Sequence, residues 1–426
     1  MKQVSIVDST QLYQRILQLS SPWKVSSVTM EDASGQVVVE IVNDPVVPML
    51  CPVCGGWTTL YDHVPVRRWR HLDTCQLSTI IECSIPRVKC DKDGIQQPRV
   101  PWADPHSRFT QLFEMRAIDA MLMCPRSKAS ELLGTSEDSL GRIANRAVER
   151  GLERKAAARQ NGTLAIPKHM SVDEKYWRGR NCATVIGDTE EGIVEELIPG
   201  NGKAQVQSWF QALPEPAKLA IKSVTMDFHR PFRSAVEATI PEAQSKIVFD
   251  KFHLVKLAND AMEETRRADV AHYQKSDKEF ASILKKSRYS LLRSGERLKP
   301  GQQEKIDTVD EWFQQTGDAY RMKESLRQIM SHTLAQQVES LLGEWVAWAQ
   351  QGKLKPMKRV AALIGRSMFG ILNIFRLKRS NANAESLNAR IQAVRIKSRG
   401  HRSYESFRRD VFFHLGGLDL YPAVSV

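Results

Sequence analysis

Two aspartates each follow a short apolar run in the middle of the chain. Residues 221–226 lead into Asp227, and residues 247–249 lead into Asp250, with His253 three residues later. The segment between the runs has the periodicity of an amphipathic helix, so the stretch predicts a strand–helix–strand unit. Ligands bind beyond the carboxyl ends of such strands, and carboxylates there suit Mg²⁺ or Mn²⁺. A structural role as helix N-caps is the alternative for either acid.

Three more strands are expected upstream, at residues 167–173, 181–187 and 193–198. The first of them delivers Asp173. The order of three strands, helix, strand, helix, strand, with acids on the first and fourth strands, is that of the ribonuclease-H-like fold, an α/β architecture. In that fold the first three strands form an antiparallel meander and the fourth lies beside the first. Asp173 and Asp227 are therefore expected side by side.

From about residue 254 to residue 375 the pattern is almost continuously helical, which predicts an all-helical insertion. The helix after it should bury an apolar stripe made of Leu387, Ile391 and Val394. Glu385 and Asn388 are three residues apart on a different face, which can turn toward the acids.

Cys51 and Cys54 form a CxxC turn, and Cys90 is a third candidate ligand for a zinc ion. The candidates for the fourth ligand are Asp93, Cys83, Cys75, His63 and His71. The chain has seven cysteines, and this pattern favours a reducing compartment and a metal site over disulfides. A metal-free knuckle is the alternative.

Residues 127–134 and 135–143 predict a helix-turn-helix, in which Gly134 ends the first helix. Arg142, Asn145 and Arg146 are then placed on the recognition helix for contact with DNA. Upstream, the run from Val66 to His71 surrounds a tryptophan with Arg67, Arg68 and Arg70, which suits phosphate contact. That run is also compatible with a strand whose arginines face water.

The net charge of +12 and a pI of about 9.3 favour a polyanionic partner, nucleic acid first. The excess is local: residues 376–409 hold ten Lys or Arg residues against two acids. The DNA-binding candidates in this basic run are Arg395, Lys397, Arg399 and Arg402. The N-terminus lacks the apolar core of a signal peptide and no apolar run could span a membrane, so we expect a cytoplasmic protein.

With these features in place, the chain resembles bacterial insertion-sequence transposases of the DDE type, in particular the ISL-three family. The resemblance covers nearly the whole chain. It rests on the CxxC turn and on the segments Arg68–Asp73, Pro101–Ala103, Ser107–Thr110, Val172–Lys175, Met226–Asp227, Phe249–His253, Asn383–Asn388, Arg399–Gly400 and Gly416–Pro422.

The resemblance implies that Asp173, Asp227 and Glu385 are the catalytic acids and hold two Mg²⁺ or Mn²⁺ ions for phosphoryl transfer on DNA. Asp250 and His253 match an accessory DxxH signature, and Asn388 could orient Glu385. His253 could contact the scissile phosphate, act as a general base, or make a structural hydrogen bond. Members of the family often carry His where this chain has Asp93, so we expect Asp93 to be a weaker fourth zinc ligand.

The implied partner is double-stranded DNA, as terminal inverted repeats and target, bound by a homodimer that associates with the nucleoid. A structure-selective nuclease on the same fold and a domesticated DNA-binding regulator are the alternatives. The expected domains are residues 1–45 (helix and hairpin), 46–105 (zinc module), 106–160 (helix-turn-helix), 161–254 and 376–426 (the two parts of the catalytic domain, the second with a basic C-terminal helix), and 255–375 (helical insertion).

Overall fold

The computed structural model of the protein describes residues 8–379 and 381–423. The chain forms two compact units. The first comprises Met1–Ala158 together with Leu418–Val426, and the second comprises Arg159–Gly417. The end of the chain therefore groups with the N-terminal unit, whereas the sequence placed residues 418–426 with the catalytic part.

The first unit begins with the predicted helix and hairpin, followed by a four-stranded sheet. The elements are α1 (Ser9–Ile16), β1 (Trp23–Glu31), β2 (Gln36–Asn43), β4 (Arg67–Thr74) and β5 (Leu77–Cys83). The sheet has the order β1-β2-β5-β4, and only the β2–β5 pair is parallel. Alternate residues bury one face, where Trp69 packs edge-on against Trp102.

A second, three-stranded sheet consists of β3 (Thr59–His63), β6 (Pro86–Cys90) and β7 (Gly94–Gln96) in the order β3-β6-β7. Cys90 is the last residue of β6 and pairs with Gly94 of β7. The hairpin between these strands folds Asp93 back toward Cys90.

Three helices complete this unit, α2 (Gln111–Met123), α3 (Arg126–Leu133) and α4 (Glu137–Gln160). Gly134 ends α3 in the left-handed conformation, with φ of 56°. The Ser136 hydroxyl accepts from the Ser139 amide at 3.2 Å, as an N-cap does. The predicted helix–turn–helix is therefore present, and its second helix runs on through the charged segment.

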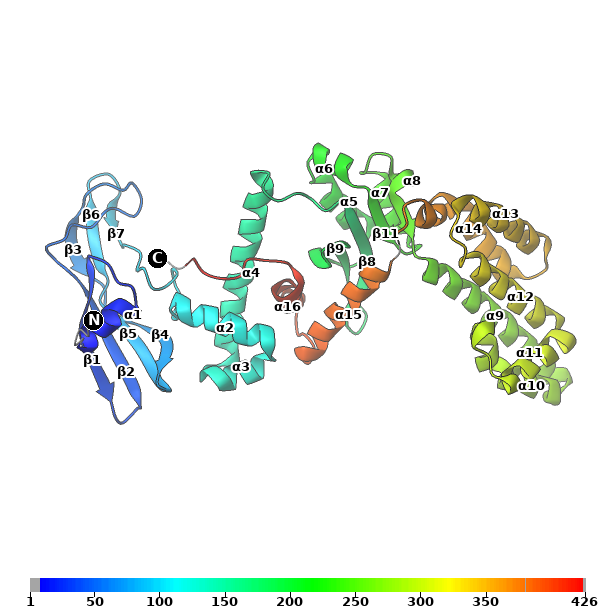
Figure 1. Ribbon diagram of the computed structural model, residues 1–426, viewed down its shortest axis with the longest axis horizontal. Helices are drawn as coiled ribbons and strands as arrows, with labels where there is room; N and C mark the ends of the chain where they lie inside the picture. The colour runs from blue at the N-terminus through cyan, green and yellow to red at the C-terminus, as the bar shows by residue number, and fades with distance from the viewer. Residues whose placement is uncertain (1–7, 380, 424–426) are drawn as a thin grey trace, which may run out of the picture. The chain divides into compact units, whose positions relative to one another are not determined.

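The second unit is built on a mixed five-stranded sheet (Figure 1). Its strands are β8 (His169–Arg178), β9 (Asn181–Asp188), β10 (Ile193–Pro199), β11 (Ser223–Met226) and β12 (Ile247–Phe249). The order is β10-β9-β8-β11-β12; β8 to β10 form the predicted antiparallel meander, and β11 lies parallel to both β8 and β12.

Residues of β8 alternate between two faces of this sheet. Met170 and Val172 join the core that includes Phe210 of α5 (Lys203–Gln211) and Phe232 of α7 (Arg230–Glu237). Ser171 faces the other way. A Cβ built on Gly187 would lie 2.9 Å from the Ser171 hydroxyl and 2.5 Å from Leu387, so glycine is required where α15 (Ala382–Lys397) approaches the sheet.

The remaining elements of this unit are helical. Two short helices, α6 (Glu215–Ala220) and α8 (Ala243–Lys246), connect the strands. An all-helical part follows, with α9 (Lys251–Ser276), α10 (Lys278–Leu292), the 3₁₀ turn Gly295–Arg297, α11 (Pro300–Trp312), α12 (Gln314–Ile329), α13 (Ala335–Gln351) and α14 (Lys355–Arg376) (Figure 1). After α15, α16 (Tyr404–Leu415) packs against α15 and β10. Within residues 8–379 and 381–423, none of the helices has the length and apolarity of a membrane span.

Candidate functional site

Three aspartates lie side by side on three neighbouring parallel strands of the second unit's sheet. Asp227 and Asp250 directly follow β11 and β12, whereas Asp173 lies within β8, which continues to Arg178 instead of ending at residue 173 as predicted. Met226 of β11 pairs with Val172 on one side and with Phe249 on the other. The next residue along each strand is therefore Asp173, Asp227 or Asp250. The register of the sheet thus brings together three acids that are far apart in the sequence, as predicted for the first two.

Asp173 points to the face of the sheet that α15 covers, like Ser171 two residues before it. The Asn388 side chain of α15 donates a hydrogen bond to Asp173 Oδ2. The Glu174 amide donates to Asp173 Oδ1 at 2.7 Å. Burial raises the pKa of Asp173, and the charge of Asp227 raises it further. A crowded pair of carboxylates of this kind fits a divalent cation, which would offset both costs.

Asp250 is buried and caps α9, accepting from the Phe252 amide at 2.8 Å. His253 Nδ1 lies 3.5 Å from Asp250 Oδ2. The hydrogen bond with Asp250 raises the pKa of His253, and the charge of Asp227 adds to that shift. The structure shows the capping role considered for Asp250, and it places a half-buried, readily protonated imidazole beside that carboxylate; the accessory role stays a prediction.

Glu385 is not gathered with the other two predicted catalytic acids. It is exposed in the first turn of α15, and among residues 8–379 and 381–423 its side chain makes no hydrogen bond or ion pair. Within the same residues, the only group of three or more His, Cys, Asp or Glu residues whose ligand atoms lie within 4.8 Å of one another is the cysteine cluster described below. Glu385 lies one helical turn before Asn388, which reaches Asp173.

The asparagines of α15 do more than the sequence suggested. Asn388 bonds Asp173 rather than Glu385, so its predicted partner was wrong. Asn381 donates to Asp250 Oδ2 at 3.3 Å, and Asn383 donates to the Thr189 carbonyl at 2.6 Å. The sequence reading missed Asn381 and Asn383 as anchors, although the amide-rich run 381–388 was the signal for them.

The zinc candidates Cys51, Cys54, Cys90 and Asp93 form one cluster, with their ligand atoms within 4.8 Å of one another. Cys54 Sγ and Cys90 Sγ are 3.5 Å apart, and Asp93 Oδ2 is 3.2 Å from Cys51 Sγ. Three thiols and one carboxylate at these separations fit a tetrahedral zinc ion. Next to the Asp93 carboxylate the pKa of Cys54 rises to about 12, so a bound cation would be needed to keep Cys54 a thiolate.

The other candidates for the fourth ligand lie elsewhere. Cys83 is buried in the core of the first sheet, and His71 is buried with Nδ1 2.9 Å from the Thr110 hydroxyl. His63 bonds the Asn43 side chain at 3.1 Å, and Cys75 occupies an exposed turn with φ of 50°.

Two of the arginines predicted to contact DNA make ion pairs within the first unit. Arg146 forms an ion pair with Glu114, whose side chain is 1% exposed. Arg70 is 14% exposed, pairs with Asp73, and donates to the His71 carbonyl at 2.6 Å. Both guanidinium groups therefore have partners inside the first unit, and DNA contact by Arg70 and Arg146 stays a prediction. Arg142 and Asn145 are exposed on α4, one turn apart, as a recognition helix requires.

Arg67 and Arg68 of β4 remain at the surface, where Arg68 Nε pairs with Glu82 at 2.9 Å. In the C-terminal basic run, Arg395 donates to the Tyr176 carbonyl at 2.9 Å. Arg399 and Arg402 are exposed, and Lys397 is partly exposed. The start of α15 lies near the acids, and the basic run at its other end has basic side chains at the surface.

Comparison with known proteins matches three segments of the chain to family models. Residues 170–411 match a family model described as a transposase, and residues 98–148 match the helix-turn-helix domain of transposase family ISL3. Residues 48–93 match the zinc-finger of the transposases IS204, IS1001, IS1096 and IS1165.

Two curated relatives span almost the same length. The transposase for insertion sequence element IS1557 of Mycobacterium tuberculosis is 27% identical over 401 residues, which cover 88% of each chain. The transposase for insertion sequence element IS1001 of Bordetella parapertussis is 24% identical over 361 residues, covering 84% of this chain and 87% of that one. The chain belongs to the ISL3 family of insertion-sequence transposases.

Proposed function

We propose that this chain cleaves and joins DNA through a DDE triad of Asp173, Asp227 and Glu385 on a ribonuclease-H-like domain. The observation that carries the proposal is the position of Asp173, within β8, beside Asp227 at the carboxyl end of the parallel strand β11, with α15 bonded to Asp173 through Asn388. The three carboxylates would hold Mg²⁺ or Mn²⁺. Two such ions supply activation of the attacking oxygen and stabilisation of the leaving 3′-oxygen.

The chain's own residues have separable roles in this proposal. Asn388 fixes the orientation of the Asp173 carboxylate, and Asn381 fixes Asp250. His253, whose pKa is raised beside Asp250, presents a positive charge to the scissile phosphate. Glu385, exposed one helical turn before Asn388, is proposed to be the third carboxylate at the bound cation.

The helix-turn-helix is proposed to bind the terminal inverted repeats through Arg142 and Asn145, with the exposed residues of the C-terminal basic run on the DNA backbone. Joining of two ends calls for two catalytic domains, so a homodimer is proposed for the reaction complex. Zinc is proposed to hold the Cys51 cluster together and so to support this DNA-binding unit.

Incubation of the protein with duplexes that carry the DNA flanking its gene, with Mg²⁺ and with EDTA, tests the proposal. Strand-resolved gels should show cleavage at the terminal repeats and joining to target DNA only with Mg²⁺. Asp227→Asn should abolish both products while a gel shift with the same ends survives. Cleavage by this variant within about tenfold of wild type would remove Asp227 from the mechanism. Cleavage without joining would favour a nuclease.

A further inference from the structure

A hollow on the first unit is lined by four residues, and all four are basic. Arg67 and Arg68 come from β4, and His106 and Arg108 come from the loop that precedes α2. The hollow has a volume of about 500 Å³ and opens to solvent. The apolar walls that bury a small organic ligand are absent, so the lining favours a small anionic group.

The charge of the hollow is largely uncompensated. Glu82 pairs with Arg68 Nε at 2.9 Å. Arg67 stacks over Trp69 at 4.9 Å from the ring centroid and donates to the Ser107 carbonyl at 3.4 Å. Among the residues that the structure describes, the side chains of His106 and Arg108 make no hydrogen bond or ion pair. Three guanidinium groups therefore face the hollow with a single carboxylate beside them.

The loop that carries His106 and Arg108 is held to β4 through its backbone. The Arg70 amide donates to the Arg108 carbonyl at 2.9 Å, and the Thr110 amide donates to the Arg70 carbonyl at 3.0 Å. His106 has a φ of 61°, a left-handed conformation that few residues other than glycine adopt. These contacts fix the backbone on both sides of the hollow.

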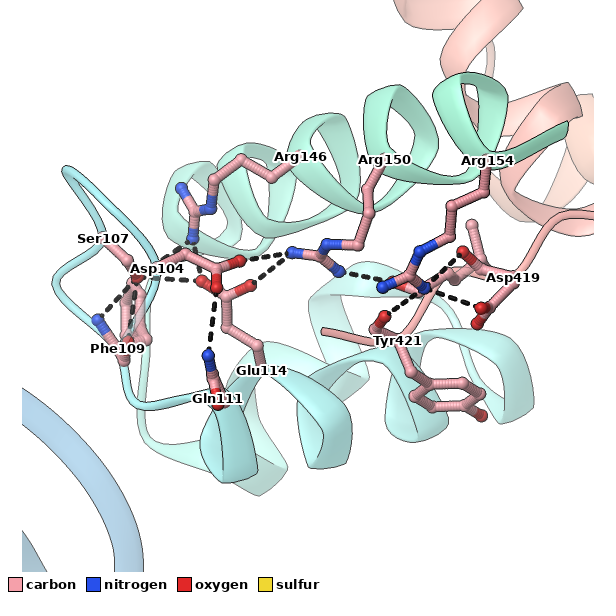
Figure 2. Close-up of polar contacts among 11 residues, drawn as sticks. Asp104, Ser107, Phe109, Gln111, Glu114, Arg146, Arg150, Arg154, Asp419 and Tyr421 are labelled. Atoms are coloured by element: carbon pink, nitrogen blue, oxygen red, sulfur yellow. Dashed lines mark hydrogen bonds and ion pairs between the residues drawn. The ribbon is translucent and has the colours of Figure 1, made fainter. Parts of the chain in front are cut away.

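A buried polar network that includes side chains of α2 and α4 also holds this loop in place (Figure 2). The Ser107 hydroxyl donates to Glu114 Oε1 at 2.8 Å. Glu114 in turn pairs with Arg146 and, at 3.5 Å, with Arg150, which also pairs with Asp104 at 2.8 Å. Because this network holds the loop and backbone hydrogen bonds connect the loop to β4, the hollow is organised before any ligand arrives.

We propose that this hollow holds one phosphate of the backbone of bound duplex DNA. The proposal rests on the proposed function in one respect, that the first unit binds DNA. Guanidinium forks match phosphate oxygens in geometry and in charge. A contact of this kind positions the protein on the duplex without reading its sequence.

The test is the salt dependence of binding to a duplex, measured for wild type and for Arg67→Gln with Arg108→Gln. The slope of log affinity against log salt is negative, and loss of one phosphate contact should make it less steep by about 0.9, equally for specific and unrelated sequences. Adding Arg68→Gln should not flatten the slope any further, because the hollow takes one phosphate. Three separate contacts would flatten the slope by about 2.7 in the triple variant, and that result would overturn the single-phosphate hollow.

Arg15→Gln provides the matched control, because Arg15 is an exposed arginine of the same unit on α1. Should Arg67→Gln impair folding, Arg68→Gln with Arg108→Gln replaces it, with the same expectation. A double variant whose slope equals that of the Arg15→Gln control overturns the proposal, provided that wild type binds DNA. Absence of DNA binding by the wild type would instead refute the proposed function.

Inorganic phosphate separates the two possible sources of the anion. Without DNA, phosphate added at constant ionic strength should not raise the thermal midpoint of wild type by more than it raises that of the double variant. A phosphate-dependent rise in wild type only, together with an unchanged DNA slope, would assign the hollow to a free anion and overturn the DNA contact.

Discussion

In the folded protein the ionised form of Asp173 is disfavoured, mainly because the side chain is buried and also because of the negative charge of Asp227. Its folded pKa lies above the unfolded value. The resulting loss of stability is absent below the unfolded pKa and is complete once the pH has risen through the folded pKa. The proposed catalytic acid therefore costs stability at neutral pH as long as no cation is bound.

Asp173→Asn should abolish cleavage and at the same time raise the thermal midpoint of the metal-free protein at pH 7. The gain should shrink as the pH falls toward 4, because the wild-type carboxyl then becomes neutral as well. Thermal unfolding in EDTA across this pH range provides the measurement. A midpoint at pH 7 that is unchanged or lower would mean that the ionised Asp173 is well stabilised without metal.

His253 should show the opposite dependence on pH. Its folded pKa is raised, chiefly by the hydrogen bond with Asp250, so its stabilising effect is fully present below the unfolded pKa near 6.5 and is lost as the pH rises through the folded value. His253→Gln should lower the thermal midpoint more at pH 6 than at pH 9. Equal losses at both pH values would assign His253 a packing role instead.

Residue types alone could place the acids but not their partners. The apolar runs before Asp173 and Asp227 were enough to predict that the two acids lie side by side on neighbouring strands, although β8 runs on past Asp173 to Arg178. Arg146, in contrast, stands on a recognition helix and reads as a DNA contact. Its buried partner, Glu114, belongs to α2, and no local pattern records a pairing between residues that distant in the sequence.

At the scale of elements, α15 is tied to the sheet edge by three asparagines with three different partners. Its periodicity predicted the buried stripe, and Leu387, Ile391 and Val394 are all buried. The rotation of the helix about its axis, which decides what Asn388 meets, depends on Leu387 fitting against Gly187. That fit belongs to tertiary packing and could not be read from the sequence.

Asn388→Ala should raise the Mg²⁺ concentration needed for half-maximal cleavage by about 10- to 100-fold, as loss of a partner behind a metal ligand does. DNA binding should be unchanged, because the N-terminal modules are untouched. Ser386→Ala, at an exposed position of the same helix, is the matched control. If both variants need the same Mg²⁺ concentration as wild type, the hydrogen bond to Asp173 has no part in holding the cation.

In the zinc module, too, the spacing of the cysteines in the sequence predicted some of the ligands, whereas the pairing of strands determines the last one. The CxxC turn and Cys90 were evident from spacing, but five residues competed for the fourth position. The β6–β7 hairpin settles the geometry by returning Asp93 to the thiols, while Cys83 is turned into the core of the other sheet. Strand pairing, and not proximity in sequence, makes that choice.

Asp93→His should increase the affinity for zinc, because imidazole is a better zinc ligand than a carboxylate at a thiolate-rich site. Retention of zinc during titration with a chelator measures the effect, and Asp91→His, at an exposed position in the same turn, is the control. Equal retention by wild type and Asp93→His would argue against Asp93 as a ligand. Less than about 0.2 zinc per chain in folded wild type would show that the cluster is a metal-free packing element.

At the scale of the whole molecule, the chain passes between its two units twice, at Ala158–Arg159 and at Gly417–Leu418. The last described residues lie along α4 and α2 of the first unit (Figure 2). Arg154 donates to Asp419 Oδ2 and to the Tyr421 carbonyl, both at 2.7 Å. The Tyr421 hydroxyl donates to Asp119 at 2.8 Å. The sequence placed this tail with the catalytic part because nothing in so short a segment indicates what it will pack against.

Gly151 makes that packing testable. A Cβ at this position of α4 would lie 2.7 Å from Leu418 Cβ and 3.2 Å from the Asp419 carbonyl, so the tail can approach only a glycine. Alanine is otherwise favoured in a helix interior by about 1 kcal/mol. Gly151→Ala should therefore stabilise α4 by about 1 kcal/mol in a chain truncated after Gly417, and should give no gain, or a loss, in the full chain.

Hydrogen exchange of α4 peptides provides the measurement. Four proteins are compared: the full chain and the truncated chain, each with and without Gly151→Ala. Truncation alone should lower protection in α4, and the substitution should restore part of it only in the truncated chain. The coupling arises because the added methyl group and the tail compete for the same space. Equal effects of Gly151→Ala in both chains would show that residues 418–423 do not pack on α4 in solution. The tail would then be assigned to the second unit, as the sequence predicted.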